Sequence, residues 1–154
     1  MTISSIDAGK TLCELSGWEV SNFRLQKLLY IADMYYMGRT EGKALIDEDF
    51  EAWQYGPVEP MLYRYCKVYG ASSIGRIFPK NGGAGDNTPE FEILNEITEA
   101  AKGVTDAALV SFTHWEKGAW YEVYKRRKRE IIIPRHLIME EYEKRLQKRE
   151  TKEA

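Results

Sequence analysis

The side chain best suited to acid–base chemistry near neutral pH is that of His114, which follows Thr113. A hydrolase built on this imidazole needs a nucleophile and an orienting acid around it. The candidates Thr113, Ser111, Cys66 and Asp106 form no recognised arrangement with it. We therefore expect no enzyme and no cofactor, with a hydrolase around His114 as a minor alternative. The imidazole is expected to close a helix and to hydrogen-bond a backbone carbonyl.

A second candidate site is a run of five consecutive basic residues. It consists of Lys125, Arg126, Arg127, Lys128 and Arg129. Such a run can attract phosphates or an acidic partner surface. On a helix, however, successive side chains are spread by about 100° per residue and cannot all meet one ligand. We expect a solvated face, and keep a nucleic-acid-binding regulator as the alternative.

Composition limits what kind of protein this is. With 154 residues, 44% of them hydrophobic, the chain can bury one sizeable core and is expected to form a single domain. A formal net charge of -2 gives no overall attraction to nucleic acid or to an anionic membrane. No apolar run approaches the roughly 20 residues that span a bilayer, so a cytoplasmic protein is expected. Cys13 and Cys66 lack metal-ligand spacing and are expected as reduced, buried thiols, with no metal site.

The elements that must position these side chains are mostly helices. Phe23 to Met37 is apolar around nearly its whole circumference, which predicts a central helix. Gln26, Tyr30 and Asp33 form one polar stripe on it, which must meet polar partners. Lys27 is expected to be exposed or to snorkel, or to pair with Asp33 or an acidic hairpin residue.

A hairpin is expected next, with Ala44 to Ile46 pairing with 49–55 around the acidic Asp47-Glu48 turn. In this interpretation Gly56 ends the second strand, and Pro57 and Pro60 lie in the first turn of a helix that runs to Tyr69. The aromatic residues Trp53 and Tyr55 would then fix a strand-to-helix corner inside the core. The alternative is that they anchor a partner, since interface hot spots favour Trp and Tyr.

Caps and breakers delimit the other elements. Gly38 and Gly42 are expected to end the central helix, and 71–87 to form a long loop. Further helices are expected to begin at Ser5, Thr88-Pro89, Thr105-Asp106, Trp120 and Pro134, with Ile131 to Ile133 as a short apolar insertion. The predicted fold is mainly α, with about six to seven helices and one small β-hairpin. The domain is expected to span 1–147, followed by a polar tail over 148–154.

Three motifs in this chain resemble the signature of the SocA-like, or Panacea, antitoxin domain family. The first is Leu25-Gln26-Lys27-Leu28-Leu29-Tyr30; the second is Trp53-x-Tyr55-Gly56-Pro57-Val58, followed by Tyr63; the third is Thr113-His114 followed by Trp120. Ala119 stands where the family commonly has a proline before this tryptophan. The resemblance covers most of the chain.

The resemblance implies a compact, mostly helical domain with a small hairpin, found in bacteria and phages beside toxin genes. It implies an antitoxin that neutralises a cognate protein toxin by direct protein–protein binding, either by occlusion or with delivery to a cellular protease. Two alternatives stay open: a nucleic-acid-binding regulator that uses Lys125 to Arg129, and an accessory interaction protein of a phage or mobile element. No membrane partner is expected.

Overall fold

A helix with almost no exposed face, α2 (Asn22–Arg39), forms the centre of the computed structural model, which describes residues 2–125 and 131–153. The side chain of Ser21 caps this helix by accepting a hydrogen bond from the Arg24 N–H at 3.2 Å. Buried residues occupy all sides of α2, as the continuous apolar pattern predicts. The other elements are therefore arranged as layers around one buried rod.

The described residues contain seven α-helices, one 3-10 turn and three short strands. In chain order they are α1 (Ser5–Leu15), α2 (Asn22–Arg39), β1 (Glu51–Trp53), β2 (Gly56–Val58), α3 (Pro60–Cys66), η1 (Lys67–Tyr69), α4 (Pro89–Ala100), α5 (Asp106–Thr113), α6 (Ala119–Tyr124), β3 (Ile131–Ile132) and α7 (Arg135–Glu153). None of the described helices is both long and apolar enough to span a bilayer. The mainly helical fold predicted from the sequence is confirmed.

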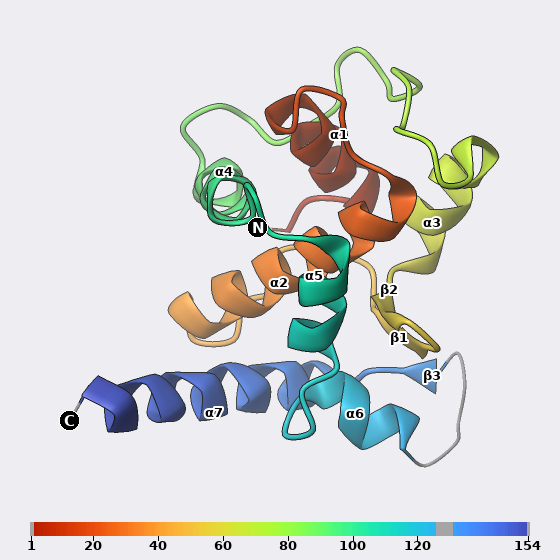
Figure 1. Ribbon diagram of the computed structural model, residues 1–154. Coiled ribbons are helices and arrows are strands. Elements are labelled where there is room, and N and C mark those ends of the chain that lie inside the picture. Colours follow the sequence, from red (N-terminus) through yellow and green to blue (C-terminus); the bar gives the residue numbers. More distant parts are fainter. Residues whose placement is uncertain (1, 126–130, 154) are drawn as a thin grey trace.

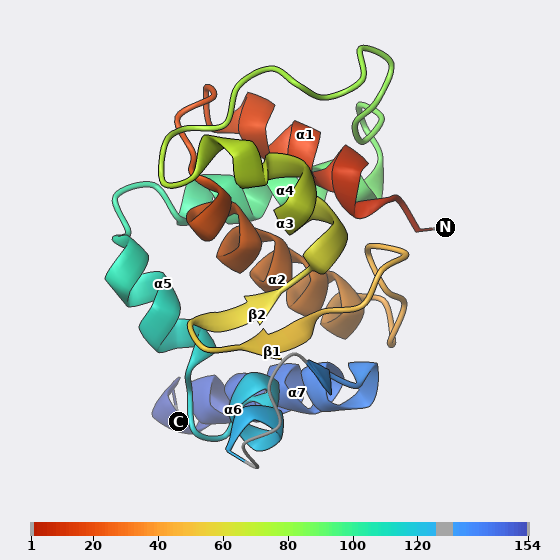
Figure 2. The ribbon, with the colours of Figure 1, turned by 90° about the vertical axis from the view of Figure 1, so that its right-hand side faces the viewer.

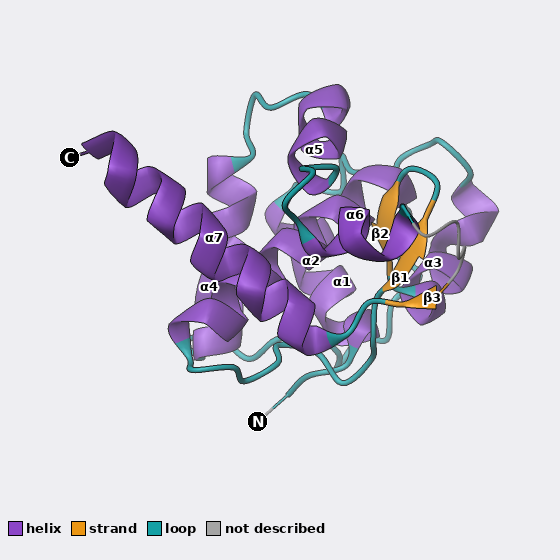
Figure 3. Ribbon diagram, turned by 90° about the horizontal axis from the view of Figure 1, so that it is seen from below, coloured by secondary structure: helices purple, strands orange, loops and turns teal. Residues whose placement is uncertain are grey.

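Helices cover α2 from two opposite sides. In Figure 1, α1 and α4 lie above α2, whereas α7 runs below it. Turning the molecule by 90° shows the β1–β2 hairpin between α3 and the α6–α7 layer (Figure 2). Seen from below, α7 crosses the molecule, with α6 and the three strands gathered near one of its ends (Figure 3). The strands therefore lie where the helical layers meet.

The polar stripe of α2 finds a separate partner for each of its members, as expected. Gln26 accepts a hydrogen bond from the Glu59 N–H at 2.8 Å, and the Tyr30 hydroxyl donates to Glu141 at 2.7 Å. The Asp33 carboxylate accepts from the Leu45 N–H at 2.8 Å. Burial raises the pKa of Asp33 to about 6, although this backbone hydrogen bond opposes the shift. The stripe thus ties three distant segments to the central helix.

The predicted hairpin has the wrong strands. The structure pairs β1 with β2, with Ala52 opposite Pro57, and leaves Ala44 to Ile46 with a single bridge to Ile3. Gly56 begins β2 instead of ending a strand, and it has a φ of +118°, which a side chain disfavours. Pro57 lies in β2 and not in a helix; β2 is an edge strand, where a missing N–H is tolerated.

Two further boundaries differ from the sequence prediction. Ile131 and Ile132, expected as an apolar insertion, form strand β3 on the other edge of β1, in the sheet order β2-β1-β3. The cap of α1 is Ser4, whose hydroxyl accepts from the Asp7 N–H, and not Ser5. The predicted starts at Thr88-Pro89 and Thr105 are confirmed by side-chain caps.

Side chains of α1 hold the long loop that precedes α4 (residues 71–87). The Gly83 N–H donates to Asp7 at 2.9 Å, and the Ala84 N–H donates to the Thr11 hydroxyl at 2.7 Å. The Lys10 ammonium donates to the Pro79 carbonyl at 2.7 Å. At the other end of the chain, α7 continues through the polar segment to Glu153.

Gly38 does not break α2, which ends at Arg39. Its missing side chain instead lets α7 approach, because a Cβ at this position would overlap the ring of Tyr142. The Tyr142 ring also packs edge-on against Tyr35, with the ring centroids 5.7 Å apart. The glycine is therefore a packing requirement of the α2–α7 contact.

We predict that Gly38→Ala lowers the free energy of unfolding by about 1–3 kcal/mol, although alanine favours an isolated helix. In a Tyr142→Ala background the overlap is gone, so the same substitution should be neutral or stabilising by up to about 1 kcal/mol. Urea unfolding of the four proteins of this double-mutant cycle measures both values. A loss of similar size in both backgrounds would contradict the packing explanation.

Candidate functional site: the hairpin pocket

A pocket of about 320 Å³ opens between the hairpin, the first turns of α2 and the start of α3. We call it the hairpin pocket. Its lining residues are mostly aromatic and include one cation: Phe23, Lys27, Trp53, Gln54, Tyr55, Val58 and Tyr63. Five of these seven belong to the family motifs found in the sequence: Lys27, Trp53, Tyr55, Val58 and Tyr63.

Lys27 is buried, with 1% of its surface exposed, which corrects the expectation that it is exposed or snorkels. Its ammonium lies 3.5 Å from the Pro57 carbonyl and 4.6 Å from the centroid of the Phe23 ring. Phe23 and Lys27 are four residues apart on α2, so they share one helix face. No carboxylate among the described residues forms an ion pair with Lys27; Asp33, one expected partner, binds the Leu45 N–H instead.

Burial lowers the pKa of Lys27 to about 8, because the charged form loses its hydration. The side chain is therefore still mainly protonated at neutral pH. A buried cation without a matching anion is unfavourable for folding. Lys27 is thus a charge that the fold holds at a cost in stability.

Gly56 makes room for this lysine. A Cβ at Gly56 would lie 3.0 Å from the Lys27 Cε and 3.0 Å from the Thr113 Oγ1. Both contacts are tighter than ordinary van der Waals distances, and the positive φ adds a second reason for glycine. The Gly-Pro motif therefore brings the hairpin backbone against α2, with the Pro57 carbonyl facing the ammonium.

Gln26 and Asn22 fix the start of α3 relative to α2. The Gln26 side chain accepts from the Glu59 N–H and donates to the side-chain amide oxygen of Asn22 at 3.3 Å. Asn22 in turn donates to the Tyr63 carbonyl at 3.0 Å. The Glu59 carboxylate caps α3 by accepting from the Leu62 N–H at 2.9 Å. This network places the Tyr63 ring at the pocket wall.

The aromatic walls form two pairs. Trp53 and Tyr63 pack edge-on with centroids 5.0 Å apart, and Phe23 and Tyr55 do so at 6.4 Å. Trp53 is half-buried, whereas 60% of Tyr55 is exposed, so the prediction that Tyr55 lies inside the core is wrong. Tyr55 lies in the tight turn between β1 and β2, and a turn at a sheet end projects outward.

His114 and Trp120 support the hairpin from behind. Their rings are parallel at a centroid distance of 3.8 Å, and the Trp120 indole N–H donates to the Trp53 carbonyl at 2.7 Å. His114 closes α5, as expected, and hydrogen-bonds the Tyr55 backbone. Burial and the nearby Lys27 charge lower the pKa of His114, so the neutral imidazole prevails at pH 7. The Thr113 hydroxyl donates to the Val110 carbonyl at 3.1 Å and not to the imidazole.

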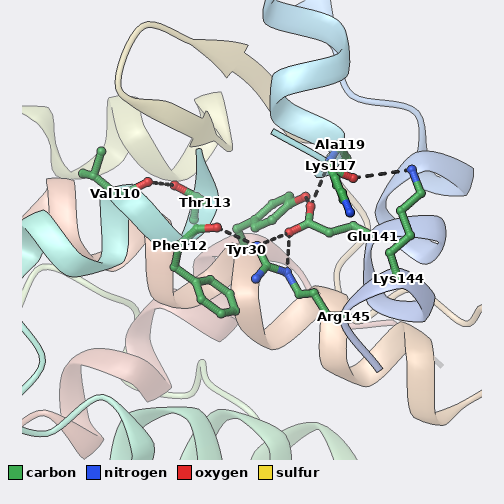
Figure 4. A network of polar contacts seen from close by, with 9 residues as sticks. All are labelled: Tyr30, Val110, Phe112, Thr113, Lys117, Ala119, Glu141, Lys144 and Arg145. Atoms are coloured by element: carbon green, nitrogen blue, oxygen red, sulfur yellow. Dashed lines mark hydrogen bonds and ion pairs between the residues drawn. The ribbon is translucent and has the colours of Figure 1, made fainter. Parts of the chain in front are cut away.

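Glu141, which the sequence analysis did not single out, organises the layer beneath (Figure 4). Its buried carboxylate accepts from the Tyr30 hydroxyl at 2.7 Å and from the Ala119 N–H at 3.0 Å. Arg145, four residues later on α7, forms an ion pair with it at 2.7 Å. The Arg145 guanidinium also lies 3.7 Å from the Phe112 ring centroid. The only sequence signal for this site is the Glu–Arg spacing of four residues.

The remaining predicted residues serve the core or fall outside the described part of the chain. Leu25 and Leu28 are buried in the hydrophobic core. Of the basic run, Lys125 is exposed and forms an ion pair with Glu122 at 2.9 Å. The other four basic residues, 126–129, lie outside the described residues. Within the described ranges, no group of His, Cys, Asp and Glu side chains is placed to hold a metal ion.

Comparison with known proteins agrees with the motifs. Residues 25–121, more than half of the chain, match the family described as antitoxin SocA-like, Panacea domain. Antitoxin SocA of Caulobacter vibrioides (strain NA1000 / CB15N) is 42% identical over 55 residues, which are 36% of this chain and 29% of that protein. The aligned part thus spans less than a third of that relative's length. No solved structure matches the chain.

We predict that Lys27→Met stabilises the protein by about 1–3 kcal/mol at pH 7, because it replaces an uncompensated buried charge by an apolar group of similar shape. Between pH 8 and 10.5 the unfolded chain holds the Lys27 proton and the folded chain does not, so rising pH stabilises the wild type. The advantage of the variant should therefore shrink over that range. Thermal unfolding at pH 7, 9 and 10.5 measures this difference.

Lys144→Met is the matched control, since the Lys144 ammonium also lies 3.5 Å from a carbonyl, that of Lys117, but is exposed. It should leave stability within about 0.5 kcal/mol at each pH. A Lys27→Met protein that is less stable at pH 7, with a constant difference across pH, would contradict the description of Lys27 as an unpaired charge.

We predict that Glu141→Gln lowers the free energy of unfolding by about 3–5 kcal/mol, because it leaves the Arg145 charge without its buried partner. Glu99→Gln, which breaks the exposed ion pair with Lys102, should cost under about 1 kcal/mol. Urea unfolding compares the two variants. Equal losses would show that the buried carboxylate does not organise the fold.

Proposed function

The chain belongs to the SocA-like antitoxin family that carries the Panacea domain, and from this membership we propose that it is the antitoxin of a toxin–antitoxin pair. It neutralises a protein toxin by direct protein–protein binding. The observation that carries the proposal is the family match over 25–121, which includes Lys27, the hairpin, His114 and Trp120. The antitoxin name of the Caulobacter relative supports the same role.

The exposed aromatics around the hairpin pocket support binding at this face. Tyr55 is 60% exposed and Phe23 37%, at the rim of a pocket whose other walls are Trp53 and Tyr63. Tyrosine and tryptophan are enriched at the centres of protein–protein interfaces, where they supply large contact areas on rigid side chains. We propose that Tyr55 and Phe23 contact the toxin.

We propose binding and not catalysis as the activity of this face. The amine and the imidazole beside the hairpin, those of Lys27 and His114, are engaged by packing contacts with Phe23 and Trp120. The hydroxyl beside the imidazole, that of Thr113, points to a backbone carbonyl. This arrangement supports a rigid, preorganised contact surface.

Co-expression with the product of the neighbouring gene tests this proposal. We expect that product to arrest growth alone, and growth to be restored by this protein together with a complex that co-purifies. A harmless neighbour with no complex would overturn the proposal. Measuring the toxin level separates two routes: occlusion leaves it unchanged, whereas delivery to a protease lowers it.

We predict that Tyr55→Ala weakens toxin binding by at least about 10-fold, as expected for an interface hot spot, with little loss of stability. Tyr121→Ala is the matched control, because Tyr121 is also an exposed tyrosine but lies on α6, outside the pocket lining. Isothermal titration calorimetry on the purified pair gives both affinities. Equal affinities for the two variants would place the interface elsewhere.

A further inference from the structure

The Lys27 ammonium has more hydrogen-bonding capacity than the chain uses. An ammonium carries three donors, and the described residues offer it one acceptor, the Pro57 carbonyl, at the long distance of 3.5 Å. The Phe23 ring face provides a weak further contact. Only 1% of the residue is exposed, so the ammonium is poorly hydrated, although Lys27 is among the residues that line the pocket.

The chain's own carboxylates near the pocket are engaged elsewhere. Glu51 accepts from the Trp53 indole N–H at 2.9 Å, and Glu59 caps α3. Asp33 binds the Leu45 N–H on another side of α2. Among the described residues, no aspartate or glutamate lines the pocket. Within this part of the chain, the Lys27 cation therefore has no anionic partner in the pocket.

The size and walls of the pocket favour one small anionic group with an apolar neighbour. A volume of about 320 Å³ is at the lower end of ligand-site sizes, enough for a side chain or a chain end. The aromatic walls lower the local dielectric, which strengthens an ion pair formed there. Gln54 adds an amide at the rim, now donating to the Tyr55 hydroxyl at the long distance of 3.4 Å.

We propose that the hairpin pocket is an anchor site for a carboxylate of the toxin, which pairs with the Lys27 ammonium while an adjacent apolar side chain packs on Trp53 and Tyr63. This inference rests on the proposed antitoxin function and specifies its chemistry. Burying the toxin carboxylate supplies the anion that the folded chain lacks, so the charge that lowers the stability of the free protein strengthens the complex.

The carboxylate can come from a C-terminus or from an aspartate or glutamate side chain, and three probes distinguish these sources. N-acetylphenylalanine presents a terminal carboxylate, N-acetylglutamyl-phenylalaninamide presents a side-chain carboxylate, and N-acetylphenylalaninamide presents none. NMR titration of the full chain follows the Trp53 indole N–H and the Lys27 side-chain signals. We expect one of the acids to bind at least 10-fold more tightly than the amide, and to raise the pKa of Lys27.

Lys27→Met should reduce binding of that acid to the level of the amide, whereas Lys144→Met should bind it like the wild type. Both variants are expected to fold, and thermal unfolding verifies this. Equal binding of acids and amide, or undiminished binding of the acid by folded Lys27→Met, would overturn the carboxylate site.

The same variants then test the site in the complex. Lys27→Met should lose at least 10-fold in toxin affinity without losing thermal stability, and Lys144→Met should neutralise the toxin fully. Full neutralisation by Lys27→Met would overturn the inference while leaving the antitoxin function intact. If the wild type itself fails to bind the neighbouring product, the antitoxin proposal fails, and the three probes still decide the pocket's chemistry.

Discussion

One buried carboxylate, that of Glu141, connects three helices of the fold, α2, α6 and α7. It accepts from Tyr30 on α2, from the backbone at the start of α6 and from Arg145 on its own helix. An isolated charge at this depth would be strongly unfavourable, so each donor is needed to keep it there. By fixing α6, the carboxylate also fixes Trp120, and Trp120 holds the hairpin through the Trp53 carbonyl.

The position of the hairpin therefore depends on the buried polar contacts of Glu141, through α6 and Trp120. The stacked rings of Trp120 and His114 support the hairpin at β1. Gln26 fixes the junction between β2 and α3 by accepting from the Glu59 N–H. Between these two supports the backbone at Gly56 approaches Lys27 closely enough to exclude a side chain. The result is a rigid pocket around one charge, which lowers the entropy lost when a partner binds.

Sequence reasoning succeeded where structure is set locally. Caps such as Thr88 and Thr105, and the mostly apolar α2, are readable because a helix signal needs only neighbouring residues. The sequence-based prediction was wrong where contacts join residues far apart in the sequence. Strand β3 pairs with β1, and nothing in the residues around Ile131 indicates this pairing. For Lys27, the flexible stem suggested snorkelling, yet burial followed from its place on a helix enclosed on all sides. Five of the seven pocket-lining residues belong to the sequence motifs, but the motifs do not indicate which of these side chains are exposed.

The separation along the chain between Tyr30 and Glu141, 111 residues, has a consequence for the order of events during synthesis. The central helix and the hairpin are translated before the carboxylate that pairs with the Tyr30 hydroxyl. Until α7 is made, the face of α2 that α7 covers has no partner. Until β3 is made, β1 is paired with β2 alone. Contacts between residues that are far apart in the sequence form slowly, because a long loop must close first. A nascent chain therefore cannot present a finished hairpin pocket, and competence to bind a partner arrives only when α7 has left the ribosome and closed the core.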